Sequence, residues 1–171
     1  DYYELSLEIF SCAAETEYVL GNFDESDVLC KTILEHARGT VDAARAYTTQ
    51  MHALGARTRY LEAIDVGWEA MDRLGEPLPK HAGPLTVFFS LWKVDSRLRR
   101  TKDVLGLPRM SHPSKVAAMQ ILNTLFVYTY TQSAALQVVV STKMINLTLD
   151  HGVMACSAVG IAFHAVILCT S

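Results

Sequence analysis

The sequence predicts an all-α fold in which antiparallel helix pairs stack as an α-α solenoid. Apolar residues recur at helical spacing along most of the 171-residue chain, which is typical of helices with one buried face. A pattern of helix, turn and helix repeats at an offset of 37 residues near the N-terminus. No segment has the features of a sheet. We therefore expect one helical-repeat region over residues 1–171.

The first helix pair is predicted within the first repeat. Apolar residues at helical spacing predict that residues 2–20 form a helix with one buried stripe, which Gly21 ends. The predicted stripe residues are Leu5, Ile9, Phe10, Ala13, Ala14 and Val19. Asp24 is then expected to cap the second helix, its carboxylate accepting a hydrogen bond from the amide of Asp27. Gly39 marks the C-terminal end of that helix.

The same pattern then recurs, with helices expected at residues 41–54 and 59–74. The alignment pairs Phe10 with Tyr47, Phe23 with Tyr60, Ser26 with Ala63, Cys30 with Gly67, and Leu34 with Met71. Large residues that face small ones let two antiparallel helices approach closely, as in tetratricopeptide repeats, although the offset slightly exceeds their spacing of about 34. We therefore expect tetratricopeptide-like repeats at 1–39 and 40–79, stacked as a right-handed superhelix.

Residues 80–171 are expected to continue the fold less regularly. Gly75 suits the left-handed residue beyond a helix end, and Pro77 and Pro79 prevent the helix from continuing. Leu136–Val140 is rich in β-branched residues, but its flanks favour helix over strand. Further helices are predicted at Pro84–Lys102, Pro113–Tyr130, Ser133–His151 and Val153–Thr170.

Composition narrows the class of protein. Half of the residues are hydrophobic, 19% are charged and the formal net charge is −3, which argues against disorder and against a nucleic-acid partner. The most apolar window, residues 155–169, has about fifteen residues, short of the roughly twenty that a spanning helix needs. We therefore expect no membrane span and a cytoplasmic location. The four widely spaced cysteines predict reduced thiols buried in helices.

The two ends of the sequence suggest a fragment of a larger chain. The sequence starts at Asp1 rather than at a methionine and ends just after the apolar run at 162–169. Without a following segment, the last helix would expose an apolar face, which predicts self-association. Light scattering from a clean monomer would count against this expectation.

No motif predicts catalysis or a bound cofactor. Neither G-x-x-x-x-G-K-[ST] nor G-x-G-x-x-G occurs, and no nucleophile elbow supports a Ser-His-Asp triad. Four acidic residues at helical spacing could gather a metal or act as acid and base, but such a row is usually a solvated face, here balanced by Arg59 and Arg73. These four are Glu62, Asp65, Glu69 and Asp72.

A second metal hypothesis concerns His151, Cys156 and His164. No two of them have the i, i+4 spacing that places two ligands on one helix face. His164 lies in an apolar helix and is expected to be a core residue or an inter-helix hydrogen-bond donor. We therefore predict no metal site and no catalytic residue in this segment.

Arg97, Arg99 and Arg100 form a dense basic stretch at a predicted helix end. Cations there complement the helix dipole, which is a sufficient structural role. The alternative is docking to an acidic surface or to a phosphate of another domain, which neutralising all three arginines would test. Trp68 and Trp92 are expected to pack between helices.

Three stretches together resemble a known family. They are "YLEAIDVGWEAMDRLGEPLP", "LGLPRMSHPSKVAAMQIL", and "KMINLTLDHG" followed by "SAVGIAFHAVIL". They resemble the tetratricopeptide-like helical region that follows the ATPase module in very large multi-sensor signal transduction kinases. In that family a serine/threonine-kinase-like domain, an AAA-type ATPase, this helical region, a GAF domain and often a histidine kinase share one polypeptide.

The middle stretch is the most specific part of the resemblance. It is similar to the family pattern Leu-Pro-x-Met-x-x-Pro-x-x-x-Ala-Ala-Met-x-Ile-Leu. The matching residues are Pro108, Met110, Pro113, Ala117, Ala118, Met119, Ile121 and Leu122. These are packing and turn residues, so the resemblance implies a fold and a domain context rather than catalysis. His164 departs from the family, where an aromatic residue is commoner.

The resemblance implies a non-catalytic scaffold or signal-relay segment of a multidomain sensor kinase. ATP would then bind in neighbouring domains of a serine/threonine or histidine kinase, and this segment would bind no cofactor. The partners would be other proteins or neighbouring domains of the same chain. The alternative is a free-standing tetratricopeptide adaptor that binds a peptide in its groove. The sequence on either side would distinguish the two.

Overall fold

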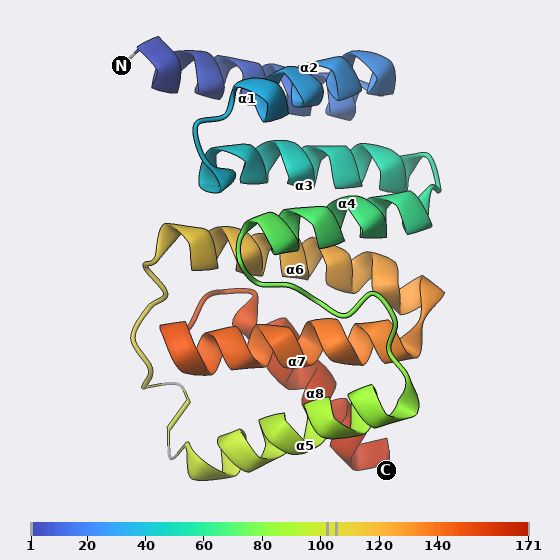
Figure 1. Ribbon diagram of the computed structural model, residues 1–171, viewed down its shortest axis with the longest axis vertical. Helices are drawn as coiled ribbons and strands as arrows, with labels where there is room; N and C mark the ends of the chain where they lie inside the picture. The colour runs from blue at the N-terminus through green and yellow to red at the C-terminus, as the bar shows by residue number, and fades with distance from the viewer. Residues whose placement is uncertain (1, 102, 105, 171) are drawn as a thin grey trace.

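The protein is all-helical in the part of the chain that its computed structural model describes, residues 2–101, 103–104 and 106–170 (Figure 1). The helices are α1 (Tyr2–Leu20), α2 (Phe23–His36), α3 (Thr40–Ala56), α4 (Tyr60–Arg73), α5 (Pro84–Arg100), α6 (Pro113–Gln132), α7 (Ala134–His151) and α8 (Ser157–Thr170). Leu136–Val140 lies inside α7, as its helical flanks predict. The all-α prediction is therefore confirmed.

The helices pack as layers along the long axis of the molecule (Figure 1). Within pairs, α1 packs on α2, α3 on α4, and α6 on α7. Between pairs, α2 contacts α3 and α4 contacts α6, while α1 contacts α3 and α3 contacts α6. The first, third and sixth helices therefore follow one another along one side of the stack.

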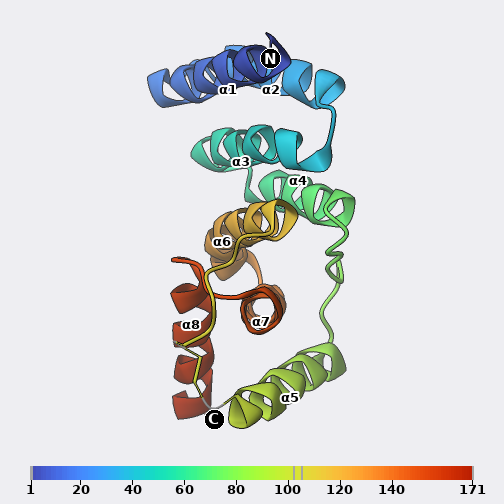
Figure 2. The same ribbon diagram turned by 90° about the vertical axis from the view of Figure 1, so that its left-hand side faces the viewer.

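Helix α5 does not lie between α4 and α6. The chain leaves α4, runs along the side of the molecule and forms α5 against α7 at the far end (Figures 1 and 2). Helix α8 also packs on α7, so α7 contacts both α5 and α8 (Figure 2). As a result, α4 and α6 are neighbours in space although a whole helix lies between them in the sequence.

Two predicted helix starts are wrong. Helix α2 begins at Phe23, after Asn22, and no side chain caps it. The Asp24 carboxylate instead lies 3.6 Å from the guanidinium of Arg57, the residue that follows α3. Helix α8 begins at Ser157 rather than Val153, because Val153 forms an isolated parallel bridge with Arg109.

The bridge depends on a close backbone approach. The Val153 amide donates to the Pro108 carbonyl and the Met110 amide donates to the Val153 carbonyl, both at 2.8 Å. Gly152 has a φ of +101°, and a Cβ there would lie 2.1 Å from the Pro108 oxygen. Only glycine fits this position.

The aligned repeat positions occupy matching places in the core. Ser26 and Ala63 are fully buried, as is Cys30, while Gly67 packs against Leu125 of α6. Burial, with a smaller effect of Asp27, raises the pKa of the Cys30 thiol to about 12, so this thiol is protonated and serves packing. Small residues therefore allow the close helix contacts that the sequence pattern predicts.

Three packing predictions need correction. The predicted buried stripe of residues 2–20 is wrong, because Leu5, Ile9, Phe10 and Val19 are exposed and of its residues only Ala14 is buried. Trp68 is buried, but Trp92 has 63% of its surface exposed and does not pack between helices. All four cysteines are free thiols, yet Cys12 and Cys169 are exposed rather than buried. These differences arise because helical spacing reveals that a residue shares a face but not whether another helix covers that face.

Candidate functional site

A hollow lies along the side formed by α1, α3 and α6. It has a volume of about 680 Å³ and also reaches the turn before α8. Its lining residues are Glu15, Tyr18, Val19, Arg45, Thr48, Thr49, His52, Gln120, Asn123, Thr124, Met154, Ala155 and Cys156. We call this hollow the inner groove. Three helices from three different pairs contribute to it.

Arg45 fixes one end of the inner groove. Its guanidinium makes ion pairs with Glu15 and with Glu8, the latter at 2.9 Å. These hydrogen bonds raise the pKa of Arg45 and lower the pKa of Glu8. One cation pairs here with two carboxylates, so the cluster has a net charge of −1 and its polar groups are held in fixed directions.

His52 and Tyr18 form an aromatic wall of the inner groove, and Tyr128 contacts His52 from outside it. Tyr18 stacks on the His52 ring with centroids 5.9 Å apart, and the Tyr128 hydroxyl lies 3.3 Å from its Nδ1. Burial lowers the pKa of His52, so the ring is neutral at neutral pH. This wall can pack against an apolar or aromatic side chain without adding charge.

The α6 wall supplies uncommitted amide groups. The hydroxyls of Thr48, Thr49 and Thr124 donate to carbonyls one turn earlier in their own helices. Gln120 and Asn123 make no side-chain hydrogen bond to any residue that the structure describes. A side-chain amide both donates and accepts, and so can pair with the backbone of an extended peptide.

Sequence reasoning did not identify the inner groove. Its α3 residues Arg45, Thr48, Thr49 and His52 have the spacing i, i+3, i+4, i+7, which marks a polar stripe along one helix face. The stripe is visible in the sequence. That it faces a second stripe on α6 depends on the direct contact of α3 with α6.

Arginines offset part of the negative charge of the acidic residues along α4. Glu62 pairs with Arg59, and Glu69 lies 2.9 Å from Arg73, so the two predicted arginines do offset it. Asp65 is exposed. Within the described ranges, no group of three His, Cys, Asp or Glu side chains is arranged to hold a metal ion.

His151, Cys156 and His164 do not form one site. His151 is exposed at the end of α7, Cys156 borders the inner groove, and His164 is buried in α8. His164 is a core residue as expected, but neither ring nitrogen has a hydrogen-bond partner among the described residues. Its expected role as an inter-helix donor is therefore wrong. Burial lowers its pKa, and nearby Asp95 opposes that shift.

The predicted docking arginines are placed differently from one another. Arg97 donates to Asn146 Oδ1 at 2.6 Å and pairs with Asp150, which ties α5 to α7. Arg99 pairs with Asp95 one turn earlier in α5, and Arg100 is exposed. Arg97 thus has a structural role, and the exposed pair Arg99 and Arg100 remains available for the predicted docking role.

Comparison of the chain with protein-family models, with curated proteins and with solved structures finds no match. None of the helices within the described ranges combines the length and the apolar character needed to cross a membrane.

Proposed function

We propose that this chain is a non-catalytic scaffold or signal-relay segment that works through protein-protein or interdomain contacts. One observation carries the proposal: α1, α3 and α6, from successive helix pairs, line a single groove with polar and aromatic side chains. A groove shared by several repeats is the usual binding surface of helical-repeat proteins.

We further propose that the helix pairs form a tetratricopeptide-like right-handed superhelix. The pairs α1–α2, α3–α4 and α6–α7 share one contact pattern: the second helix of a pair packs on the first helix of the next pair. On this reading α5 is an insertion between the second and third repeats. The inner groove is then the concave face of the superhelix.

The groove chemistry suits an extended peptide. Amides of Gln120 and Asn123 can pair with peptide backbone, and the Tyr18–His52 wall can receive an apolar side chain. Arg45 is held by Glu8 and Glu15, so acidic peptides gain little here. The ligand class that fits best is a neutral peptide segment with one large apolar residue.

The resemblance supplies the proposed context, a cytoplasmic sensor kinase whose neighbouring domains bind ATP. The groove would engage another segment of that polypeptide or a partner protein, and so couple nucleotide state to kinase output. Deleting residues equivalent to 1–171 from such a kinase should alter its regulation. Unchanged regulation would refute the relay role.

A second experiment tests whether regulation needs the inner groove itself or only the folded segment. The double change Asn123→Ala and Gln120→Ala removes both free amides without altering the core. We expect it to change kinase regulation in the intact protein as the deletion does, whereas Gln132→Ala, at the end of α6 and outside the groove, should not. If kinase regulation is normal with both changes, the inner groove is not needed and the segment acts as a spacer.

The alternative is a free-standing tetratricopeptide adaptor, which the same groove also favours. The two are distinguished by the flanking coding sequence: a nucleotide-binding loop upstream and a GAF or histidine-kinase pattern downstream favour the kinase. A start codon and a stop codon at the two ends favour the adaptor.

A further inference from the structure

The inner groove has two chemically different ends. Arg45 and His52 line it seven residues apart on α3, so at 1.5 Å per residue they lie about 10 Å apart along the helix axis. On α1, Glu15 pairs with Arg45. Three residues later Tyr18 stacks on His52, so along α1 the same two ends are only about 4–5 Å apart. We call them the charged end and the aromatic end.

Arg45 has no hydrogen-bond donor left for a ligand at the charged end. Its Nε and Nη2 groups donate to the Glu15 carboxylate, and its Nη1 group donates to both oxygens of Glu8 at 2.9 Å. Nη2 also donates to the Cys12 sulfur at 3.6 Å. These five donor contacts match the five N–H groups of a guanidinium. Arg45 therefore holds the two carboxylates in place and does not itself recognise a ligand.

The two carboxylates keep acceptor capacity that Arg45 does not use. A carboxylate has about four acceptor sites, whereas Glu15 accepts two hydrogen bonds and Glu8 accepts three, including one from Cys12. The Glu15 side chain is 41% exposed and the Glu8 side chain is 64% exposed. A ligand group at the charged end must therefore donate, and the excess negative charge favours a cation.

Neighbouring charges do not cancel this excess. Helices α1, α3 and α6, which form the groove, contain five acidic residues and two basic ones. The basic residues are Arg45 and Lys115, and Lys115 pairs with Glu76 outside the groove. Arg109 is exposed beside the bridge to Val153 and is not among the residues that line the groove. The charged end is therefore negative overall.

We propose that the inner groove binds an extended peptide in which a lysine or arginine lies two residues from a large apolar residue. The inference rests on the proposed function and adds one basic residue to the otherwise neutral segment proposed there. Side chains i and i+2 of an extended chain point to the same face about 7 Å apart, which lies between the spacings of the two ends along α1 and α3. The basic side chain pairs with Glu15, and the apolar one packs on Tyr18 and His52.

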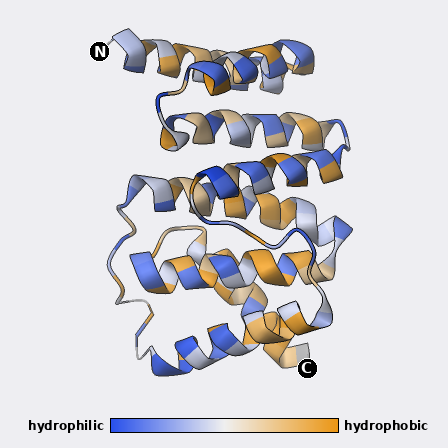
Figure 3. Ribbon diagram, viewed as in Figure 1, coloured by the Kyte–Doolittle hydropathy of each residue, from blue (hydrophilic) through white to orange (hydrophobic). Residues whose placement is uncertain are grey.

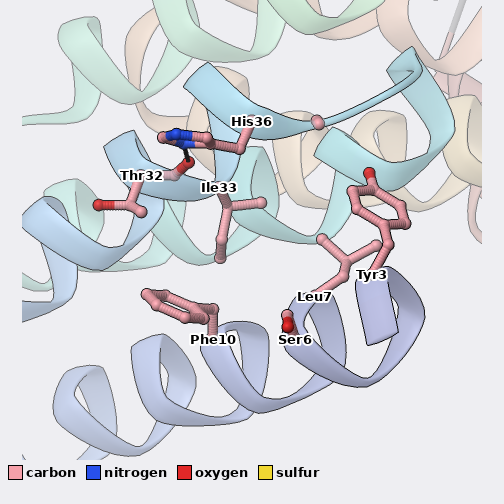
Figure 4. A pocket seen from close by; sticks show the side chains of 8 residues that line it. Tyr3, Ser6, Leu7, Phe10, Thr32, Ile33 and His36 are labelled. Atoms are coloured by element: carbon pink, nitrogen blue, oxygen red, sulfur yellow. Dashed lines mark hydrogen bonds between the residues drawn. The ribbon is translucent and has the colours of Figure 1, made fainter. Parts of the chain in front are cut away.

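Two other exposed apolar surfaces can hold the apolar residue of such a peptide but not its cation. Figure 3 shows the first half of α5 as hydrophobic, and Phe88 and Trp92 are exposed there, but four of the five charged residues of α5 are basic. Between α1 and α2, Leu7 and Phe10 point toward Ile33 in a hollow of about 280 Å³ (Figure 4). Its lining, among the described residues, includes no carboxylate. A preference for a basic peptide therefore reports binding in the inner groove.

The test measures the binding of capped peptides to the 171-residue chain by fluorescence anisotropy with an uncharged dye. One peptide, Ser-Lys-Ser-Trp-Ser-Lys-Ser, has a lysine two residues from tryptophan in either chain direction, and a second has glutamate in place of both lysines. We expect the dissociation constant of the lysine peptide to be about tenfold lower. A third peptide, Ser-Ser-Lys-Trp-Lys-Ser-Ser, should bind more weakly than the first, because adjacent side chains point to opposite faces.

Charge variants of the protein assign this preference to the groove. Glu15→Gln leaves Arg45 paired with Glu8 and removes the excess negative charge, so the lysine and glutamate peptides should then bind within about twofold of each other. If that variant folds poorly by circular dichroism, Glu8→Gln removes the same charge from the other side of Arg45. Glu25→Gln is the matched control, because Glu25 is exposed on α2 outside the groove. Trp92→Ser removes an exposed apolar residue of α5 and should also keep the tenfold preference.

Three results would overturn the inference. Equal affinity of the parent chain for the lysine and glutamate peptides shows that the charged end does not select a cation. A preference that persists in both Glu15→Gln and Glu8→Gln arises elsewhere on the surface. A preference that disappears in Trp92→Ser assigns the peptide to α5.

The inference and the proposed function can fail separately. If both peptides bind equally and the double variant at Asn123 and Gln120 binds neither, the inner groove takes a peptide without selecting charge, and only the inference fails. If the parent chain binds no peptide at all, the peptide ligand and the inference both fail. The deletion experiment then still tests the relay role.

Discussion

Gly67 is the residue that sets how closely α4 approaches α6. A Cβ at this position would lie 2.5 Å from Leu125 Cδ2 and 3.0 Å from Met51 Cε. Both neighbours are completely buried and have no room to move. The alignment of Cys30 with Gly67 predicts a small residue at this position. In the structure, the absence of a side chain lets Leu125 of α6 and Met51 of α3 pack directly on the backbone of α4.

Replacing Gly67 by alanine should destabilise the protein. Overpacking costs about 1–3 kcal/mol, and the better helix propensity of alanine recovers up to about 1 kcal/mol. We expect a net loss of about 1–2 kcal/mol in the free energy of unfolding, measured by urea denaturation. Gly39→Ala is the control, because a Cβ there meets nothing within 4 Å and its backbone is extended. Equal stability of the two variants would contradict the packing argument.

His164 should make α8 sensitive to acid. Burial lowers its pKa below the ordinary value of 6.5, although Asp95 acts in the opposite direction. The unfolded chain therefore binds a proton at a higher pH than the folded chain does. Stability associated with the neutral ring is complete above about pH 6.5 and is lost as the pH falls toward the folded-state pKa.

The change His164→Phe should remove this part of the pH dependence. We expect the free energy of unfolding to fall less steeply below pH 6.5 than in the parent chain, as measured by urea denaturation over a pH series. His81→Phe alters an exposed histidine and should leave the slope unchanged. His52 keeps some acid sensitivity in both variants, because burial lowers its pKa as well.

At the scale of elements, Glu76 holds three segments together. It follows α4 and makes ion pairs with Lys115 at the start of α6 and Lys143 in α7. Only 13% of its side chain is exposed. Burial alone would raise the pKa of Glu76, but hydrogen bonds from the two lysines outweigh burial and lower it. This cluster joins the end of the second helix pair to the third pair, although α5 lies between them in the sequence.

The change Glu76→Gln should destabilise the junction. It leaves two partly buried lysines without a counter-charge, so we expect a loss of about 1–3 kcal/mol at neutral pH in denaturant unfolding. Because the folded-state pKa is lowered, this contribution is present above the unfolded value near 4.5 and is lost as the pH falls through the folded value. The parent and the variant should therefore converge in acid. A constant difference at all pH values would assign the effect to packing.

At the scale of the whole molecule, α5 is an appendage to a continuous stack. Helices α4 and α6 contact each other directly, and among the residues that the structure describes, α7 is the one helix that α5 contacts extensively. The arrangement implies that the stack does not need α5 in order to fold.

Replacing Pro84–Arg100 by a flexible linker should leave the rest of the protein folded. A helix of this length spans about 25 Å, which a glycine-serine linker of about 20 residues covers. We expect the loss in helical circular dichroism to equal that of one helix, and we expect a lower melting temperature because the Arg97–Asp150 ion pair is gone. Cooperative unfolding of the remainder is the decisive observation. A molten remainder would show that α5 is integral to the core.

The sequence by itself determined the helices and their close contacts. Helical spacing, Gly21, Gly75 and the two prolines after it place most helix ends within a few residues, because these signals act through the local backbone. Small residues such as Ala63 and Gly67 likewise predict tight packing, because only they permit it.

Only the tertiary structure decided which helices are neighbours and which faces stay open. The direct contact of α4 with α6 joins residues separated by a whole helix, and it creates the inner groove from polar stripes on α3 and α6. Trp92 has the same helical spacing as a core residue, yet it is exposed because no other helix in the described part of the chain covers that side of α5. Periodicity defines a face of a helix, whereas long-range packing determines whether anything covers it.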